Sequence, residues 1–200
     1  MEDEMSTQDL KERLALIESM IAEGRRSMAG WGWCFVLWGV AFYVAMAWTA
    51  WGPKSIFAWP VTVTVACLAT VLLAARTARH QPATTLGRAV SSVWIAVGIS
   101  MFVVLFALGW HGLLEQHVFM GILAAMLGSA NAASSLILKW KAQFGCTLVW
   151  WIACAVCVSG TGTESNAALF VAIFVCQIVF GIYAMILESR RRGQHGVAHA

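Results

Sequence analysis

The fold is decided by an apolar stretch that reads WGWCFVLWGVAFYVAMAWTAW over residues 31–51. This stretch contains no acidic or basic side chain. The hydrocarbon core of a bilayer is about 30 Å thick, and a helix that rises about 1.5 Å per residue crosses it in about 20 residues. Tryptophans stand near both ends of the stretch, where indole rings favour the level of the lipid headgroups. The stretch therefore predicts a transmembrane helix.

The rest of the chain has the composition of an integral membrane protein. Of its 200 residues, 60% are hydrophobic and 12% are charged, and the mean hydropathy is +0.74. An ordinary soluble domain is about 25% charged. Further apolar runs occupy residues 56–75, 89–110, 118–138, 144–158 and 167–187. The sequence thus predicts an all-α, polytopic protein in which residues 29–189 form a six-helix transmembrane domain. The fifth run is the shortest, so its helix would need tilt or local thinning of the bilayer.

The basic residues indicate an orientation, because Lys and Arg accumulate in short cytoplasmic loops. With six spans, all of the thirteen Lys and Arg residues except Lys54 fall on one side of the membrane. That side also holds both termini, including a basic cytosolic tail at 190–200. We therefore expect a multi-pass protein of the cell inner (plasma) membrane with cytoplasmic N- and C-termini. The basic residues lie beside the apolar runs and the net charge is only +3, so the lipid bilayer is an expected partner and nucleic acid is not.

Residues 1–28 precede the first span and predict a cytosolic amphipathic helix followed by a juxtamembrane segment. Apolar residues recur at spacings of four, three and four along one narrow seam. The seam residues are Leu10, Leu14, Ile17 and Ile21. Gly24 can adopt the left-handed conformation that ends a helix. Residues 1–24 contain seven acidic and two basic side chains, which is the wrong balance for binding an anionic lipid surface. We expect the seam to bind a protein partner or to form a homo-oligomer; the alternative is packing on this protein's own cytosolic loops.

The fourth run carries the most polar face within the spans. Small residues at a spacing of four predict a close approach of helices; they are Gly121, Ala125, Ser129 and Ala133. The amide of Asn131 must find partners in hydrocarbon, and Gln177 in the sixth run is the other candidate amide. The sequence therefore predicts an intramembrane polar patch of Ser129, Asn131, Ser134 and Gln177. The patch either holds helices together or lines a pocket for a solute or ligand.

Few residues could carry chemistry. At mid-depth the six runs contain no Asp, Glu, Lys, Arg or His, which proton relays and most intramembrane hydrolases require. Near the turn after the third run, His111, Glu115 and His117 are ligand types that zinc or another divalent metal accepts. Their spacing matches no specific motif, so solvated loop residues are the alternative, and no cofactor is expected.

The six cysteines all fall in apolar runs, where free Cys behaves as a small hydrophobe. Cys154 and Cys157 stand at i and i+3 on one helical face, as two thiolates of a metal or redox site would. No second pair and no nearby His supports such a site. Packing is therefore the preferred interpretation.

Three function hypotheses follow from these patterns. The leading one is a non-enzymatic inner-membrane protein that acts as a subunit, anchor or regulator through its cytosolic helix. The second is a small-solute transporter or channel that uses the polar patch on the fourth and sixth helices. The third is a membrane enzyme or redox protein, for which the sequence offers no phosphate-binding glycine loop, nucleophile elbow or zinc-protease signature.

Overall fold

A computed structural model describes residues 2–53, 55–78, 85–113 and 115–197 of the chain. Within these ranges every regular element is a helix. The elements are α1 (Glu2–Ala29), α2 (Gly32–Trp51), the 3₁₀ helix η1 (Ser55–Phe57), α3 (Ala58–Ala78), α4 (Thr85–Trp110), α5 (Gln116–Leu138), α6 (Lys141–Ser159), α7 (Gly162–Ile173), the π-helix η2 (Phe174–Val179) and α8 (Phe180–Val197).

Six helical segments are long and apolar enough to cross a membrane. They are α2, most of α3, α4, α5, α6 and one continuous rod, Gly162–Arg190, that joins α7, η2 and α8. The number of segments agrees with the sequence prediction. The fifth segment is longer than predicted, because α6 begins at Lys141 and has 19 residues, or about 28 Å of helix. This length is close to the thickness of the hydrocarbon core of a bilayer, about 30 Å.

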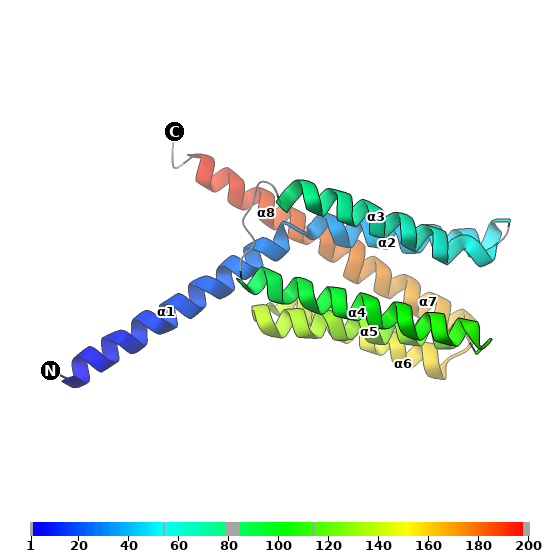
Figure 1. Ribbon diagram of the computed structural model, residues 1–200, viewed down its shortest axis with the longest axis horizontal. Coiled ribbons are helices and arrows are strands. Elements are labelled where there is room, and N and C mark those ends of the chain that lie inside the picture. The colour runs from blue at the N-terminus through cyan, green and yellow to red at the C-terminus, as the bar shows by residue number, and fades with distance from the viewer. Residues whose placement is uncertain (1, 54, 79–84, 114, 198–200) are drawn as a thin grey trace.

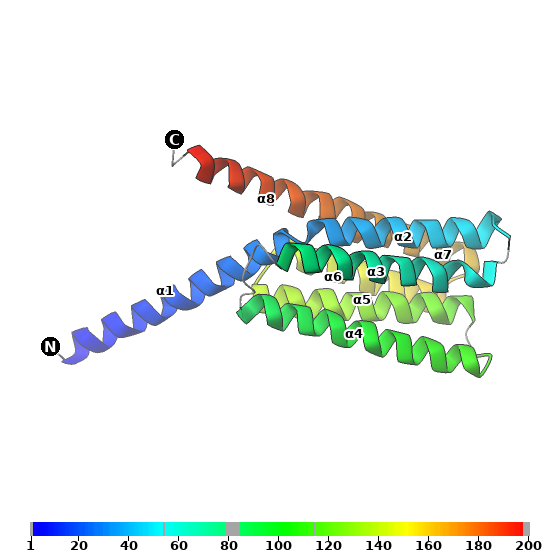
Figure 2. The same cartoon turned by 45° about the horizontal axis from the view of Figure 1, so that its top comes forward.

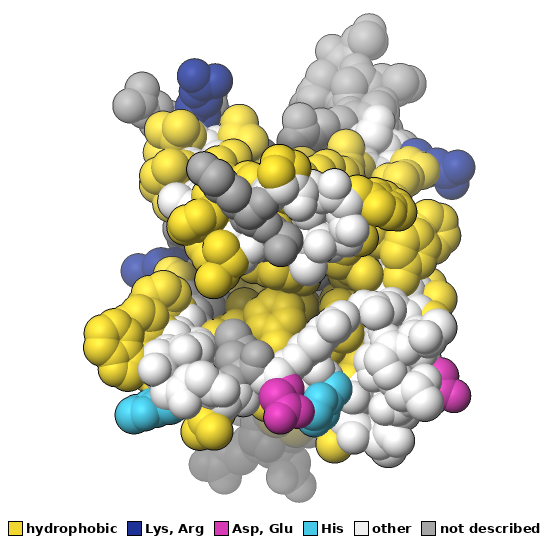
Figure 3. Space-filling view, turned by 90° about the vertical axis from the view of Figure 1, so that its right-hand side faces the viewer, with side chains coloured by type: hydrophobic (Ala, Val, Ile, Leu, Met, Phe, Trp, Pro, Cys, Tyr) yellow, Lys and Arg dark blue, Asp and Glu magenta, His cyan; other side chains and the backbone are white. Residues whose placement is uncertain are grey.

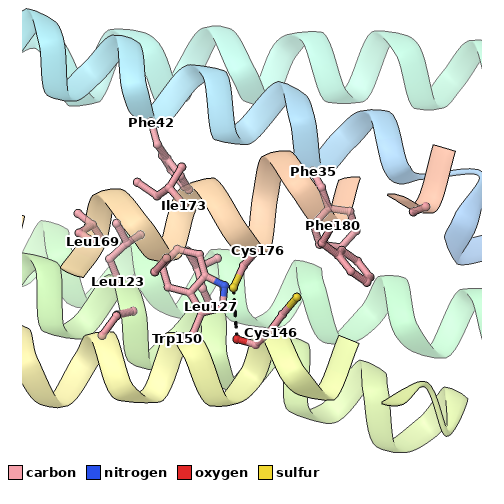
Figure 4. Close-up of a cluster of buried hydrophobic side chains, with 14 of the residues drawn as sticks. Phe35, Phe42, Leu123, Leu127, Cys146, Trp150, Leu169, Ile173, Cys176 and Phe180 are labelled. Atoms are coloured by element: carbon pink, nitrogen blue, oxygen red, sulfur yellow. Dashed lines mark hydrogen bonds between the residues drawn. The ribbon is translucent and has the colours of Figure 1, made fainter. Parts of the chain in front are cut away.

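The helices form two halves with the α7–η2–α8 rod between them (Figures 1 and 2). In one half α2 packs along α3, and in the other α5 packs along α6 and α4 covers α5. The rod contacts α2 on one side and α6 on the other. The side chain at the centre is Trp150, which is fully buried among Leu123, Leu169 and Ile173 in the cluster shown in Figure 4. The rod thus ties the two halves into one bundle.

Local chemistry explains several helix ends. Pro60 lies in the first turn of α3, where its missing N–H costs no helical hydrogen bond. At the start of α7, the Thr161 N–H donates to Glu164 Oε2 at 2.7 Å, and the Glu164 N–H donates to Thr161 Oγ1 at 3.4 Å. These two hydrogen bonds form a capping box. Such ends allow the short connection between α6 and α7.

The helix α1 projects from one end of the bundle, at the end where the chain also terminates (Figures 1 and 2). The prediction that this helix ends at Gly24 is wrong, since α1 continues to Ala29. Gly24 is needed for packing instead. A Cβ atom there would lie 2.9 Å from Leu138 Cδ2 and 3.0 Å from Leu86 Cβ, so only glycine lets α1 approach α4 and α5 this closely. The segment 190–197 of the predicted tail is likewise helical, as part of α8.

Candidate functional site

The apolar seam of α1 is exposed on the projecting part of the helix. Leu10, Leu14 and Ile17 are 59%, 52% and 51% exposed, and Ile21, nearer the bundle, is half-buried. The helix contacts α4, α5 and α8, and its buried residues there are Gly24 and Met28. The seam therefore does not pack on the described loops of its own chain, which was the alternative interpretation of the sequence.

The base of α1 is fixed to the bundle by an arginine. Arg25 Nε donates to the Leu138 carbonyl at 2.5 Å, and an Nη atom of Arg25 donates to the Lys139 carbonyl at 2.6 Å. These carbonyls lie at the C-terminal end of α5, where the last four C=O groups of a helix have no helical partner and a cation is favoured by the helix dipole. The left-handed Lys139, with φ of 50°, ends α5 at this point. The direction in which α1 leaves the bundle is thus set by specific hydrogen bonds.

The predicted polar patch divides between the interior and the surface. Asn131, Ser134 and Gln177 are buried, whereas Ser129 is exposed and its hydroxyl donates to the Ala125 carbonyl one turn earlier. Residues two positions apart point to nearly opposite sides of a helix. Ser129 and Asn131 therefore cannot share one polar face. Asn131 Nδ2 donates to the Leu127 carbonyl at 2.9 Å within its own helix.

The interior also holds polar side chains on α6 that lie outside the predicted patch. Gln143 and Thr147 on α6 are fully buried. Both amide atoms of Gln143, together with Asn131 Oδ1, Ser134 Oγ and Gln177 Oε1, have no hydrogen-bond partner among the described residues. Gln143 lies one residue before the predicted fifth span, 144–158, whose start rests on hydropathy alone. With the helix beginning at Lys141, Gln143 shares its buried face with Cys146 and Trp150.

The buried face of α5 is rotated by about one residue from the predicted stripe of small residues. Gly121, Ala124 and Gly128 are buried, whereas Ala125 and Ala133 are only partly buried. Against this face lies α6, since a Cβ atom at Gly128 would come within 2.6 Å of the Trp151 ring. The close approach of α5 and α6 is therefore real, but it uses the spacing of Gly121, Ala124 and Gly128.

The turn between α4 and α5 does not bring the candidate metal ligands together as a set. His117 Nδ1 lies 3.4 Å from Glu115 Oε2, and both side chains are well exposed. In the described ranges, no group of three His, Cys, Asp or Glu side chains is placed to hold a metal ion. The backbone at Gly112, with φ of 67°, makes the turn.

The cysteines pack in the interior or along helix faces without forming disulfides. Cys176 Sγ donates to the Cys146 carbonyl at 3.4 Å, which links η2 to α6 (Figure 4). Cys157 Sγ donates to the Ser165 carbonyl at 3.6 Å, and Ser165 Oγ donates to the Cys157 carbonyl at 3.2 Å. Each of these thiols has a structural role as a weak donor to a backbone carbonyl.

Comparison with known proteins adds no functional information for this chain. No protein-family model, curated protein or solved structure matches this chain. Two features remain as candidates: the exposed seam of α1, and the interior around Gln177.

Proposed function

We propose that this is a non-enzymatic, multi-pass protein of the inner membrane that acts as a subunit, anchor or regulator through its cytosolic helix α1. The observation that carries the proposal is the exposed seam on a helix that projects from the bundle. Leucine and isoleucine side chains at half exposure along one narrow line are typical of a helix that binds another helix. The contacts of Arg25 hold α1 to six apolar helices that would anchor it in the bilayer.

A second copy of this chain is the occupant that the charges favour. The seam residues occupy the a and d positions of a heptad repeat, with Leu10 and Ile17 at d and Leu14 and Ile21 at a. Figure 1 shows α1 leaving the bundle obliquely, mainly along the direction of the bundle's long axis, so two copies inserted with the same orientation in one membrane would pair their α1 helices in parallel. In a parallel pair the g position of one helix faces the following e position of the other. Arg13 at g then faces Glu18 at e of the second copy, twice per dimer.

Three acidic residues beside the seam are compatible with this pairing. Asp9, Glu12 and Glu23 occupy the c, f and c positions, which point away from a partner helix. Asp9 is already paired with Arg13 of its own helix at 2.9 Å, and both side chains are exposed. An exposed ion pair contributes at most about 1 kcal/mol. The apolar seam therefore supplies the affinity, and the charges select a parallel register.

The expected dimer is a reversible one. Two heptads form a short coiled coil, which is marginal in free solution. Confinement of both helices to one membrane surface raises their effective concentration, so a weak contact still assembles. Light scattering of the full chain in a mild detergent tests the proposal directly. A protein mass of twice 21.7 kDa is expected, and a monomer at every concentration would contradict it.

The proposed orientation gives a separate prediction. In a variant without the native cysteines, a single cysteine at position 115 or 164 should react with a membrane-impermeant maleimide in intact cells. A single cysteine at position 12 should react only after permeabilisation, because α1 lies in the cytosol. Labelling of position 115 only after permeabilisation would contradict the six-span arrangement.

A further inference from the structure

A cavity of about 340 Å³ lies between α2, α3 and α4. Its longest wall is one face of α2, which presents an aromatic or sulfur-bearing side chain at each turn. The aromatic residues on this wall are Trp31, Phe35, Trp38 and Phe42. Trp94 of α4 forms the opposite wall and meets Phe35 edge to face, with ring centroids 5.6 Å apart. The volume falls in the range of small-molecule sites, about 300–1,000 Å³.

The cavity exists because α3 and α4 do not pack against each other along their length. α3 packs on α2, and α4 packs on α5. Val71 of α3 and Ile95 of α4 line the cavity and are 65% and 62% exposed, so the cavity opens sideways between these two helices. At the rim, a Cβ atom on Gly98 would meet no other atom within 4 Å. In the proposed membrane this opening faces the lipid. Figure 3 views the bundle along its length from the end away from α1. It shows a hollow between the two halves, with hydrophobic side chains at its base.

Two polar atoms among the lining residues have no partner in the described part of the chain. Gln177 is 2% exposed, and its Oε1 atom accepts no hydrogen bond. Trp94 Nε1 is buried and donates none. Trp38 Nε1 differs, since it donates to Thr70 Oγ1 at 3.2 Å. An unsatisfied buried group costs about 1–3 kcal/mol, so Gln177 Oε1 as an acceptor and Trp94 Nε1 as a donor each favour a ligand that supplies the missing hydrogen bond.

The backbone is adapted to place Gln177 here. Gln177 lies in the π-helical turn η2, a form that occurs mostly as single turns inside α-helices and frequently at functional sites. Gly39 of α2 faces it, and a Cβ atom at Gly39 would lie 2.9 Å from Gln177 Cβ. The glycine therefore lets the rod carry Gln177 up to the wall of the cavity.

The lining also excludes a charged ligand group. Among the described residues the lining contains no Asp, Glu, Lys, Arg or His, and an unpaired charge is strongly disfavoured in such surroundings. A hydroxyl group both donates and accepts, so it can donate to Gln177 Oε1 or accept from Trp94 Nε1. We propose that this cavity binds a lipid alcohol, with its hydroxyl donating to Gln177 Oε1 and its aliphatic chain along the aromatic wall of α2.

Three probes with the same chain and different ends test this proposal by native mass spectrometry of the full chain. Oleyl alcohol should bind with one molecule per chain. Oleate at neutral pH and 1-octadecene should each bind at least about threefold more weakly. The carboxylate of oleate would find no countercharge in the cavity, and 1-octadecene has no group that can form a hydrogen bond. Equal binding of oleyl alcohol and 1-octadecene would overturn the proposal.

Matched variants locate the site. Gly98→Phe should abolish binding of oleyl alcohol by filling the mouth of the cavity. Gly145→Phe is the control and should leave binding unchanged. Gly145 also has open space around its Cβ position, but it lies on α6, outside the cavity. Gln177→Leu should weaken binding about three- to tenfold, and Gln143→Leu, a buried amide away from the cavity, should leave it unchanged. Equal binding to the two Gly variants would overturn the proposal even if Gln177→Leu fails to fold. Dimerisation through α1 plays no part in these results, so the two proposals fail separately.

Discussion

Replacing Leu14 and Ile17 together by aspartate is expected to convert the dimer to a monomer. Each copy would lose two apolar side chains from the interface, where a buried Leu or Ile contributes about 1.5–3 kcal/mol. The dimer would also gain four carboxylates in its seam, which cannot be buried without partners. We expect a loss of at least about 4 kcal/mol, or about a thousandfold in affinity. Light scattering in mild detergent should then report the mass of one chain.

The structure offers a matched control for this variant. Leu16 is 61% exposed and lies on the same helix, but it occupies the c position, away from the seam. Leu16→Asp should leave the dimer intact, and all of these variants should reach the membrane in wild-type amounts, because none of the three residues enters a span. Equal loss of the dimer in both variants would indicate a general effect of added charge, and no loss in either would contradict the role of the seam.

Gly181→Val is expected to lower the stability of the bundle by about 3 kcal/mol. A Cβ atom at Gly181 would lie 2.9 Å from the Gly32 carbonyl oxygen and 3.1 Å from Phe35 Cβ. The reverse contact is equally close, since a Cβ atom at Gly32 would lie 2.8 Å from the Gly181 carbonyl oxygen. The backbones of α2 and α8 therefore touch at this point, and neither can yield as a flexible side chain could. Small residues allow this approach between apolar helices in lipid.

Unfolding by sodium dodecyl sulfate in mixed micelles measures that loss. Gly145→Val is the control. Both glycines lie within a helix, but a Cβ atom at Gly145 would meet no other atom within 4 Å, unlike one at Gly181. The control removes the change in helix propensity, which is below about 1 kcal/mol. Equal unfolding midpoints for the two variants would show that α2 and α8 are not held this closely.

Much of the fold could be predicted because hydropathy is a local property. Apolar runs of about 20 residues between polar turns predict six helices without knowledge of their packing. Pro60 fits the first turn of a helix because it has no N–H to donate to a helical hydrogen bond, which is also a local property. The spacing of Leu10, Leu14, Ile17 and Ile21 places these residues on one face of any helix, and their role in binding stays a prediction.

The features that the sequence did not predict depend on contacts between distant segments. Gly24 resembles a helix end, yet its close contacts with Leu86 and Leu138 decide its role. The rotation of α5 that buries Gly128 depends on the Trp151 ring of the next helix. The π-helical turn around Gln177 has no compositional signature, because its extra residue is accommodated by packing on α2 and α6. The cavity depends on the separation of α3 from α4, which no single helix encodes.

Cysteine cross-linking in native membranes tests the central claim, a parallel pairing of α1 helices, most directly. Single cysteines are placed in turn at positions 10–21 of a variant without the native cysteines, and the disulfide-linked dimer is quantified after mild oxidation. Equivalent a and d positions face each other in a parallel pair, so the yield should peak at positions 10, 14, 17 and 21 and be low at 12 and 16. Yields that do not vary with position, or a peak at 12 and 16, would contradict the account.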